Sequence, residues 1–363
     1  MNFNLVAPIN QLGYGVVGYN VLKALMEAGH EVSYWPIGNP SWDSPSPFVQ
    51  QAIDRAKMFD SKAPSIRIWH QNDMAMFPGR GPSIGWPIFE LDSFKDVELH
   101  HLRSVDRLFV CSQWAKDVLL KVDPTLTIDV VPLGVDSKVF FADPEALRQR
   151  KYWTHDKTVF LNVGKWEVRK GHNELLEAFC QAFTPQDNVE LWMLNHNPFI
   201  GLENEQWKLR YMSSPMAEAI KIVPRIQTSA ELRQLYNTVD FGVFPSHAEG
   251  WNLEPLEMMA CGKPSIVTNY SGHTEFCNSA NSLLVEPNGM ESAQDGRWFH
   301  GEGEWCTFDI DELVVALRAA HDMKGDESYT KLANGALQTS EMFSWANSVS
   351  KIVDVVGTEV VPA

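Results

Sequence analysis

One stretch of the chain, residues 241–262, passes from an apolar run through a turn into a helix and constrains the fold more than any other. The run Phe241-Gly242-Val243-Phe244-Pro245 predicts a short buried strand, and residues 246–250 predict the turn. We expect a helix over about residues 254–260, with Gly262 as its C-terminal stop. A helix that begins beyond a strand end points free backbone N–H groups outward, so this stretch predicts an anion-binding site.

Two glutamates frame the expected site, Glu249 in the turn and Glu257 within the helix. A carboxylate close to a bound phosphate would repel it, whereas a carboxylate accepts strong hydrogen bonds from sugar hydroxyls. A nucleotide sugar carries both a phosphate and hydroxyls, so it matches the pattern. The alternative is structural: Glu249 caps the turn and Glu257 lies on a solvated helix face, where most glutamates lie.

Residues 249–262, Glu-Gly-Trp-Asn-Leu-Glu-Pro-Leu-Glu-Met-Met-Ala-Cys-Gly, resemble the donor-site signature of the retaining glycosyltransferases of family 4. The resemblance implies an α/β chain with the GT-B fold, in which two Rossmann-like domains face each other across a cleft. It also implies a set of donor contacts: Gly250, Asn252, Leu253, Glu249 on the donor sugar and Glu257 on the ribose. Asn252 stands where the family usually has glycine, which affects how closely the backbone approaches the ligand.

Length and composition agree with this class of protein. A chain of 363 residues suits two domains. The net charge of −16 disfavours non-specific binding to polyanions, so nucleic acid is not an expected partner. The five cysteines show no metal-ligand or redox spacing. The sequence pattern predicts neither a signal peptide nor a transmembrane segment, so we expect a cytoplasmic protein, and peripheral contact with a membrane is compatible with this expectation.

The N-terminal half opens with a strand, a helix and a strand over residues 5–37, which predicts a parallel sheet. Gly13, Gly15 and Gly18 fit the dinucleotide fingerprint in letter, so an NAD-dependent dehydrogenase is an alternative. That fingerprint also needs an acid at the end of the second strand, and the run Tyr34-Trp35-Pro36-Ile37-Gly38 has none. The resemblance implies that Gly13 and Gly15 face the donor phosphates, while a plain tight turn is the third interpretation.

His70 ends the expected strand at residues 66–70, and side chains at the carboxyl end of such a strand point into the ligand crevice. The family has a histidine near here against the donor sugar, with a structural histidine as the alternative. We expect an N-terminal acceptor-side domain over residues 1–148 and a nucleotide-sugar-binding domain over residues 156–339. The charged segment 141–156 predicts the linker. The resemblance implies that a C-terminal helix, residues 340–363, packs back on the first domain.

Two lysines follow the apolar run of residues 158–164 and predict a cationic pocket at a second corner between strand and helix. The resemblance implies that Lys165 and Lys170 both contact the donor diphosphate, whereas ordinary solvated lysines are the alternative. Lys165 stands where the family more often has arginine, which keeps the charge but loses bidentate geometry. Arg169 is a spare cation in this interpretation. The nucleotide base is expected at the backbone near Ile226, which leaves the identity of the base open.

Together with these features, the resemblance implies a retaining, hexosyltransferase-like glycosyltransferase with Glu249, His70 and Lys170 as its catalytic residues. The donor is a nucleoside diphosphate sugar, the acceptor is a saccharide, lipid or other hydroxyl, and neither a metal nor a further cofactor is expected. Lys165, Lys170 and the helix amides would stabilise the leaving diphosphate, which in this family is thought to take the acceptor proton during front-face attack. The alternatives are a DNA-base glycosyltransferase of the same fold, a glycogen-type phosphorylase or nucleotide-sugar epimerase with the same two lobes, a non-enzymatic nucleotide-sugar-binding protein and the NAD-dependent dehydrogenase.

Overall fold

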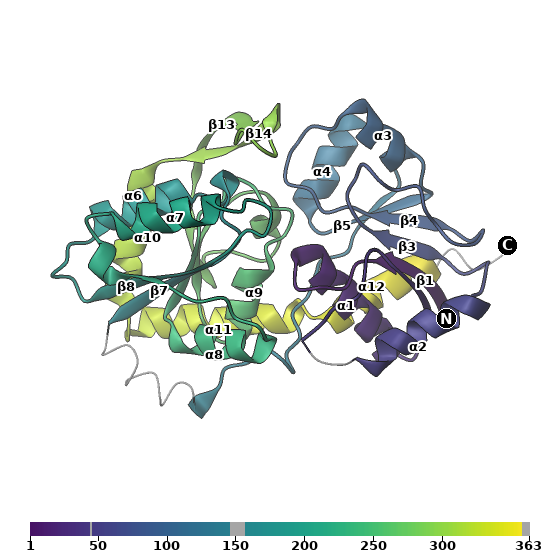
Figure 1. Cartoon of the computed structure of the whole chain (residues 1–363), viewed down its shortest axis with the longest axis horizontal. Helices are drawn as coiled ribbons and strands as arrows, with labels where there is room; N and C mark the ends of the chain where they lie inside the picture. The colour runs from purple at the N-terminus through teal and green to yellow at the C-terminus, as the bar shows by residue number, and fades with distance from the viewer. Residues whose placement is uncertain (44–45, 146–156, 358–363) are drawn as a thin grey trace. The chain divides into compact units, whose positions relative to one another are not determined.

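The computed structural model describes residues 1–43, 46–145 and 157–357, which form two compact units (Figure 1). Unit 1 comprises Met1–Asp136 with Phe343–Ala363, and unit 2 comprises Ser137–Met342. Each unit contains a six-stranded sheet in which all pairings between neighbouring strands are parallel, so the expected α/β class is confirmed. The units divide after Asp136, earlier than the expected boundary at residue 148. Residues 146–156 of the expected linker lie outside the described residues.

The sheet of unit 1 has the strand order β2-β1-β3-β4-β5-β6. Its strands are β1 (Asn2–Ala7), β2 (Glu31–Pro36), β3 (Ser65–Ile68), β4 (Ser83–Trp86), β5 (Arg107–Val110) and β6 (Ile128–Val130). The strands are short apolar runs because helices cover the faces of a parallel sheet. Those helices are α1 (Gly13–Glu27), α2 (Pro47–Arg55), α3 (Asp96–Arg103), α4 (Gln113–Val122) and α12 (Trp345–Gly357).

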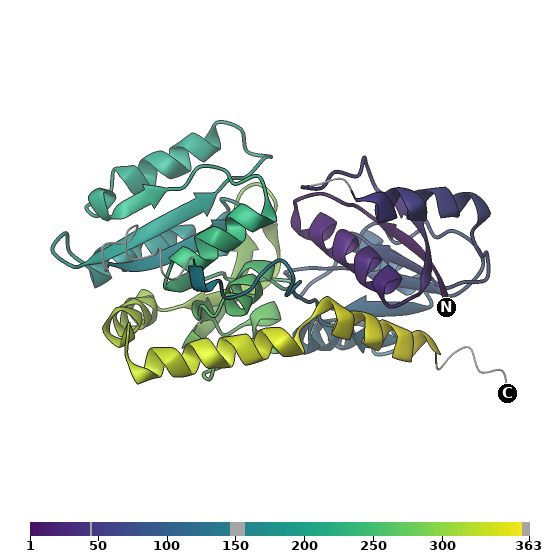
Figure 2. The same ribbon diagram turned by 90° about the horizontal axis from the view of Figure 1, so that it is seen from below.

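The C-terminal helix α12 belongs to unit 1 although it is distant from the rest of that unit in sequence. It packs against α1 (Figure 2). Its Ser348 hydroxyl donates to the carbonyl of Pro132 at 2.6 Å. Val349, Ile352 and Val356 provide its buried face at i, i+3 and i+7, the spacing of one side of a helix.

The sheet of unit 2 has the strand order β12-β11-β10-β7-β8-β9. Its strands are β7 (Thr158–Gly164), β8 (Val189–Asn195), β9 (Ile220–Ile222), β10 (Phe241–Phe244), β11 (Ser265–Thr268) and β12 (Ser282–Val285). The helices of unit 2 are α6 (His172–Ala182), α7 (Glu203–Met212), α8 (Ser229–Thr238), α9 (Leu253–Ala260), α10 (Ile310–Met323) and α11 (Glu327–Met342). α6 packs against α10, and α11 packs against α9.

The core of unit 2 is centred on β7 and β10. Phe160 of β7 and Phe241 of β10 stack with their ring centroids 6.0 Å apart, and Phe179 of α6 meets Phe160 edge-on. All three rings are fully buried, and because Phe160 and Phe241 are paired in register, they pack with Phe179 on one face of the sheet.

Unit 2 also contains an antiparallel hairpin that the sequence did not lead us to expect. β13 (Pro287–Gln294) pairs with β14 (His300–Phe308), and Asp295 closes the turn by accepting backbone hydrogen bonds from Arg297, Trp298 and Phe299. The hairpin extends away from the parallel sheet (Figure 1).

Candidate functional site

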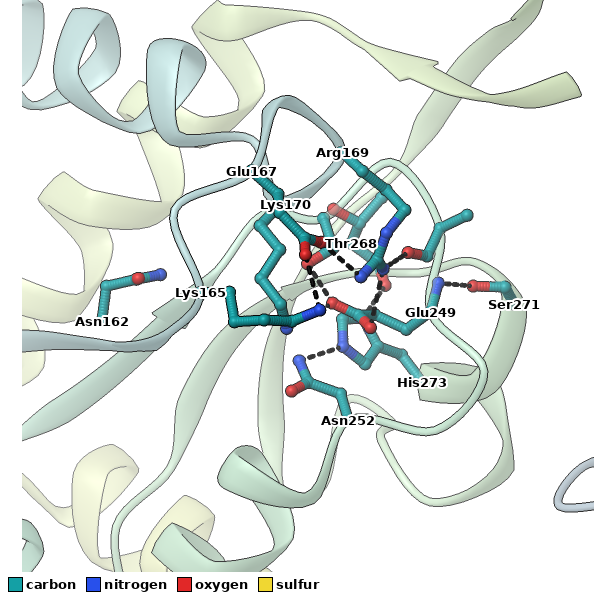
Figure 3. A network of polar contacts seen from close by, with 12 residues as sticks. Asn162, Lys165, Glu167, Arg169, Lys170, Glu249, Asn252, Thr268, Ser271 and His273 are labelled. Carbon is teal, nitrogen blue, oxygen red and sulfur yellow. Dashed lines mark hydrogen bonds and ion pairs between the residues drawn. The ribbon is translucent and has the colours of Figure 1, made fainter. Parts of the chain in front are cut away.

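The site expected after β10 lies where the strand order of unit 2 reverses. β7 leads to β8 and β9 on one side of the sheet, whereas β10, β11 and β12 follow on the other side. In open α/β sheets, ligands bind beyond the carboxyl ends of the strands at such a reversal. The loop after β7, residues 165–171, and the loop after β10, residues 245–252, therefore form the candidate site. We call these two segments the site loops (Figure 3).

The backbones of the two site loops are in direct contact. The carbonyl of Arg169 accepts a hydrogen bond from His247 N at 2.8 Å. Gly171 has a φ of 68°, and a Cβ at this position would lie 2.0 Å from the carbonyl oxygen of Pro245. Only glycine fits both the positive φ and this approach, so Gly171 sets the spacing of the loops.

A buried ionic network centred on Glu249 joins the site loops. Glu249 Oε1 lies 2.9 Å from Lys170 Nζ and Glu249 Oε2 lies 2.8 Å from an Arg169 nitrogen. Ser246 Oγ donates to Glu249 Oε1 at 2.8 Å, and the backbone N–H of Glu249 donates to Ser271 Oγ at 2.8 Å. These contacts fix the orientation of the Glu249 carboxylate, because both of its oxygens and its backbone are held (Figure 3).

The charges of this network support one another. Burial alone would raise the pKa of Glu249, but the adjacent charges of Arg169 and Lys170 hold that pKa well below its usual range. Burial alone would lower the pKa of Lys170, yet the carboxylates of Glu249 and Glu254 raise it above its ordinary value. Lys170 and Glu249 are therefore both charged at neutral pH.

Arg169 is a structural member of the network, and its interpretation as a spare cation was wrong. Its side chain is 4% exposed and pairs with Glu249 and with Glu167 Oε2, the latter at 2.9 Å. The guanidinium also donates to the carbonyl of Ala248. Lys165 lies at the edge, with its side chain 39% exposed and its Nζ 2.6 Å from Glu167 Oε1. Lys165 and Lys170 thus lie in one cluster, as predicted, with acidic partners that the sequence analysis had not assigned.

The first turn of α9 borders the same cluster. Asn252 directly precedes the helix with a φ of 75°, and its Nδ2 lies 2.9 Å from His273 Nε2 (Figure 3). Leu253 and Glu254 carry N–H groups that have no partner inside the helix, whereas Pro255 has no N–H. These donors and the positive end of the helix favour an anion beside Lys170.

Glu257 lies one turn farther along α9, where its Oε2 accepts a hydrogen bond from the Tyr236 hydroxyl at 2.9 Å. The residue is partly buried. Burial and the charge of Glu254 raise the pKa of Glu257 to about 8. The hydrogen bond from Tyr236 lowers this pKa, but its effect is smaller than that of burial. The predicted contact of Glu257 with a ribose stays a prediction.

A second polar network lies behind the loop after β7. His172 Nδ1 lies 2.9 Å from the carbonyl of Glu167, and His172 Nε2 lies 3.1 Å from Asn162 Oδ1. Asn162 Oδ1 accepts a hydrogen bond from Asn195 Nδ2 at 2.7 Å. Burial lowers the pKa of His172 to about 4, so its ring is neutral. The sequence analysis missed these residues, although asparagines inside the apolar strands β7 and β8 are a signal for a buried polar network.

The β13–β14 hairpin contacts the loop after β10 through His247. The carbonyl of His247 accepts from Cys306 N at 3.1 Å, and His247 Nδ1 donates to the Cys306 carbonyl at 2.8 Å. His247 Nε2 lies 3.6 Å from Glu174, and its ring stacks on Trp305 at 5.5 Å. The hairpin therefore supports the loop that carries Glu249, a role that only the tertiary structure reveals.

The residues predicted in the N-terminal half lie at the corresponding reversal of the other sheet, between β1 and β3 of unit 1. Gly13 begins α1 and is exposed. Gly15 is buried, and a Cβ there would lie 2.3 Å from Asn10 Oδ1, so the chain's own turn fills that space. His70 is exposed, and its ring centroid lies 4.7 Å from that of Tyr14. Donor contacts of these residues stay predictions.

Ile226 lies in the loop between β9 and α8 and is partly buried, and its contact with a base also stays a prediction. Among the described residues, no helix has both the length and the apolar character to cross a membrane. The same part of the chain has no group of three or more histidine, cysteine or acidic side chains placed to hold a metal ion.

Comparisons of sequence relate the chain to known glycosyltransferases. Residues 157–295 match the family model described as glycosyl transferases group 1. The chain is 27% identical over 239 residues to the D-inositol 3-phosphate glycosyltransferase of Geodermatophilus obscurus, which covers 64% of this chain and 47% of the relative. It is 22% identical over 348 residues to the mannosylfructose-phosphate synthase of Agrobacterium fabrum, which covers 90% of this chain and 69% of the relative.

The match covers only part of the length of the curated relatives. The chain spans less than half the length of the first two curated relatives, 47% of the one from Geodermatophilus obscurus and 36% of the corresponding Segniliparus rotundus protein. Activity and substrates of the whole protein are therefore matters of proposal.

Comparisons of structure extend over the whole chain. The sucrose-phosphate synthase of Thermosynechococcus elongatus is similar with a TM-score of 0.74 at 16% identity, covering 99% of both chains. Anabaena HepE, solved in complex with UDP-glucose, has a TM-score of 0.73 at 15% identity and covers 99% of this chain and 100% of its own. At such low identity the likeness shows the fold alone, and the predicted GT-B fold is confirmed.

Proposed function

We propose that the chain, whose residues 157–295 match the glycosyl transferases group 1 model, transfers a sugar from a nucleoside diphosphate sugar to an acceptor hydroxyl with retention. The observation that carries this proposal is the buried contact of Lys170 with Glu249 beside the first turn of α9. It puts a cation, backbone donors and an oriented carboxylate in one place, and a nucleotide sugar needs all three.

The proposed reaction uses the network through electrostatics. The bond between the anomeric carbon and the diphosphate oxygen breaks, and that carbon forms a bond to the acceptor oxygen on the same face. The acceptor proton passes to the departing diphosphate. Lys170 has three N–H donors and gives one to Glu249, so others can reach the charge that develops on the diphosphate. The fixed Glu249 carboxylate would accept hydrogen bonds from sugar hydroxyls and hold the ring in place.

The acceptor follows less directly from the site. Relatives named for phosphorylated polyols and sugars, such as D-inositol 3-phosphate and mannosylfructose phosphate, support a small hydroxylated acceptor as the first class to test. A saccharide or a lipid headgroup remains within the same proposal, because each presents a hydroxyl as nucleophile.

Two variants at the network test the proposal. The full chain is incubated with UDP-glucose, UDP-N-acetylglucosamine and GDP-mannose, with and without sugar and inositol phosphates, and release of free nucleotide is measured. Lys170→Met should weaken binding of the free nucleoside diphosphate about tenfold or more, because a charge-assisted contact is lost. Glu249→Gln should lower turnover with a smaller effect on nucleotide affinity.

Lys208→Met is the matched control, because Lys208 makes an exposed ion pair with Glu205 on α7 of the same unit. This variant should behave as the wild type. Equal nucleotide affinity of Lys170→Met and Lys208→Met would refute the phosphate role of Lys170. A wild-type protein that releases no nucleotide from any donor would contradict the proposed transferase.

A further inference from the structure

Asn252 combines burial with an unsatisfied hydrogen-bond acceptor. The residue is 7% exposed and directly precedes α9 in the candidate site. Its Nδ2 lies 2.9 Å from His273 Nε2. Its Oδ1 is buried and has no hydrogen-bond partner within the described residues.

The orientation of the Asn252 amide follows from His273. His273 Nδ1 lies 3.0 Å from the carbonyl of Thr268, and a carbonyl can only accept, so Nδ1 carries the hydrogen. Burial lowers the pKa of His273 to about 4, so the ring is neutral and Nε2 is an acceptor. The amide of Asn252 must therefore donate to His273 through Nδ2. Its Oδ1 then points away from His273, as Figure 3 shows.

A buried acceptor that lacks a donor raises the free energy of the folded protein. The penalty disappears if a ligand supplies the donor. A phosphate oxygen cannot do so, because it is itself an acceptor, whereas a hydroxyl or an amide N–H can. The chemistry of Oδ1 is therefore opposite to that of Lys170 and of the α9 amides, which attract an anion.

The neighbours of Asn252 indicate whether its Oδ1 faces the donor sugar or the ribose. His273, its anchor, is close enough to Glu249 and Lys170 for their charges to act on its ring. Glu249 is the carboxylate assigned to the donor sugar, whereas Glu257, assigned to the ribose, is paired with Tyr236 farther along α9. Asn252 therefore belongs to the sugar end of the site.

We propose that Asn252 Oδ1 accepts a hydrogen bond from a hydroxyl of the donor sugar and makes Asn252 a specificity-determining residue. This inference rests on the proposed transferase function. His273 is then a positioning residue, because it acts on the ligand only by orienting the Asn252 amide.

A backbone role is the competing explanation, because asparagine tolerates positive φ better than most residues and Asn252 has a φ of 75°. Asn252→Gly separates the two roles, because glycine keeps the backbone conformation and removes the amide. Asn269→Gly is the matched control, because Asn269 makes an exposed hydrogen bond with Glu286 in the same unit.

The experiment measures the dissociation constants of UDP-glucose, UDP-N-acetylglucosamine and GDP-mannose, and of free UDP and GDP, for the full chain. Asn252→Gly should raise the dissociation constant of the nucleotide sugar about fivefold, the loss expected for one hydrogen bond. The dissociation constant of the free nucleotide should change by no more than about twofold. A nucleotide sugar that lacks the one hydroxyl bound by Oδ1 should have the same dissociation constant for the wild type and for Asn252→Gly. Nucleotide sugars that lack any other hydroxyl should still bind more weakly to Asn252→Gly than to the wild type.

Each result decides the matter. A wild type that binds nucleotide sugars while Asn252→Gly binds them equally well overturns this inference and leaves the proposed transferase intact. An equal loss for the free nucleotide and the nucleotide sugar overturns it as well, because the side chain would not act on the sugar. A wild type that binds none of the nucleotide sugars overturns both.

Discussion

Replacing Arg169 by methionine tests whether the buried ionic network holds unit 2 together. Arg169 bridges Glu249 at 2.8 Å and Glu167 at 2.9 Å, and all three side chains are 4–6% exposed. Methionine is of similar length and removes the charge. Both carboxylates keep a lysine partner, because Lys170 still faces Glu249 and Lys165 still faces Glu167.

The magnitude follows from these contacts. Removing one partner of a buried ion pair destabilises a protein by about 3–5 kcal/mol, because the remaining charge is left without compensation. Because both carboxylates keep a lysine partner, we expect Arg169→Met to lower the free energy of unfolding by about 3 kcal/mol, the lower end of this range. At about 1.4 kcal/mol for each factor of ten, this loss corresponds to roughly a hundredfold faster hydrogen exchange from the globally protected amides of unit 2.

The measurement is hydrogen exchange by mass spectrometry on peptides that contain β7 and β10, which reports unit 2 independently of unit 1. Arg318→Met provides the matched control, because Arg318 pairs with Asp187 at 3.3 Å with 43% of its side chain exposed. That variant should cost less than about 1 kcal/mol. If both variants accelerate exchange equally, the buried network does not stabilise the unit and the reasoning fails.

Two further predictions concern titratable groups of unit 2. The pKa of Glu257 is about 8 when folded and near 4.5 when unfolded, so the folded state holds a proton that the unfolded state releases, and stability falls as pH rises through this window. Glu257→Gln should reduce the loss of stability between pH 5 and pH 8 by about 3–4 kcal/mol in urea denaturation, whereas the exposed Glu205→Gln should not. Burial alone would lower the pKa of His247, but Glu174 raises it above its ordinary value, so the stabilisation is complete below about pH 6.5 and is lost as pH rises through the folded pKa. His247→Asn should accelerate hydrogen exchange in β14 while β8 stays protected. The same substitution at the exposed His196 is the control and should change neither strand. Unchanged exchange of β14 in His247→Asn would show that His247 does not hold the hairpin.

Much of the architecture was predictable because it depends on local pattern. Short apolar runs followed by glycine-rich turns and amphipathic helices specify parallel sheets, and β7 and β10 fall where such runs stand in the sequence. The residues at the carboxyl ends of those strands follow directly, since the ends of neighbouring parallel strands share one edge. The sequence alone therefore placed three charged residues at this edge of the sheet, Lys165, Lys170 and Glu249.

The β13–β14 hairpin was less predictable, although Asp295-Gly296 is a common turn pair. Its strands alternate poorly, because β13 has a single buried residue, Ala293. Periodicity cannot mark a strand whose contacts come mainly from a partner strand and from one histidine of a distant loop.

The sequence by itself determined the fold class and the residue types at the site, because strand, turn and helix signals and the donor signature are encoded within short windows. Only the tertiary structure decided which charges are paired. Arg169 became a buried bridge, and Asn252 Oδ1 was left with no partner within the described residues. Burial and pairing depend on residues far apart along the chain, as the sequence separation of 79 between Lys170 and Glu249 illustrates, so no local pattern can specify them.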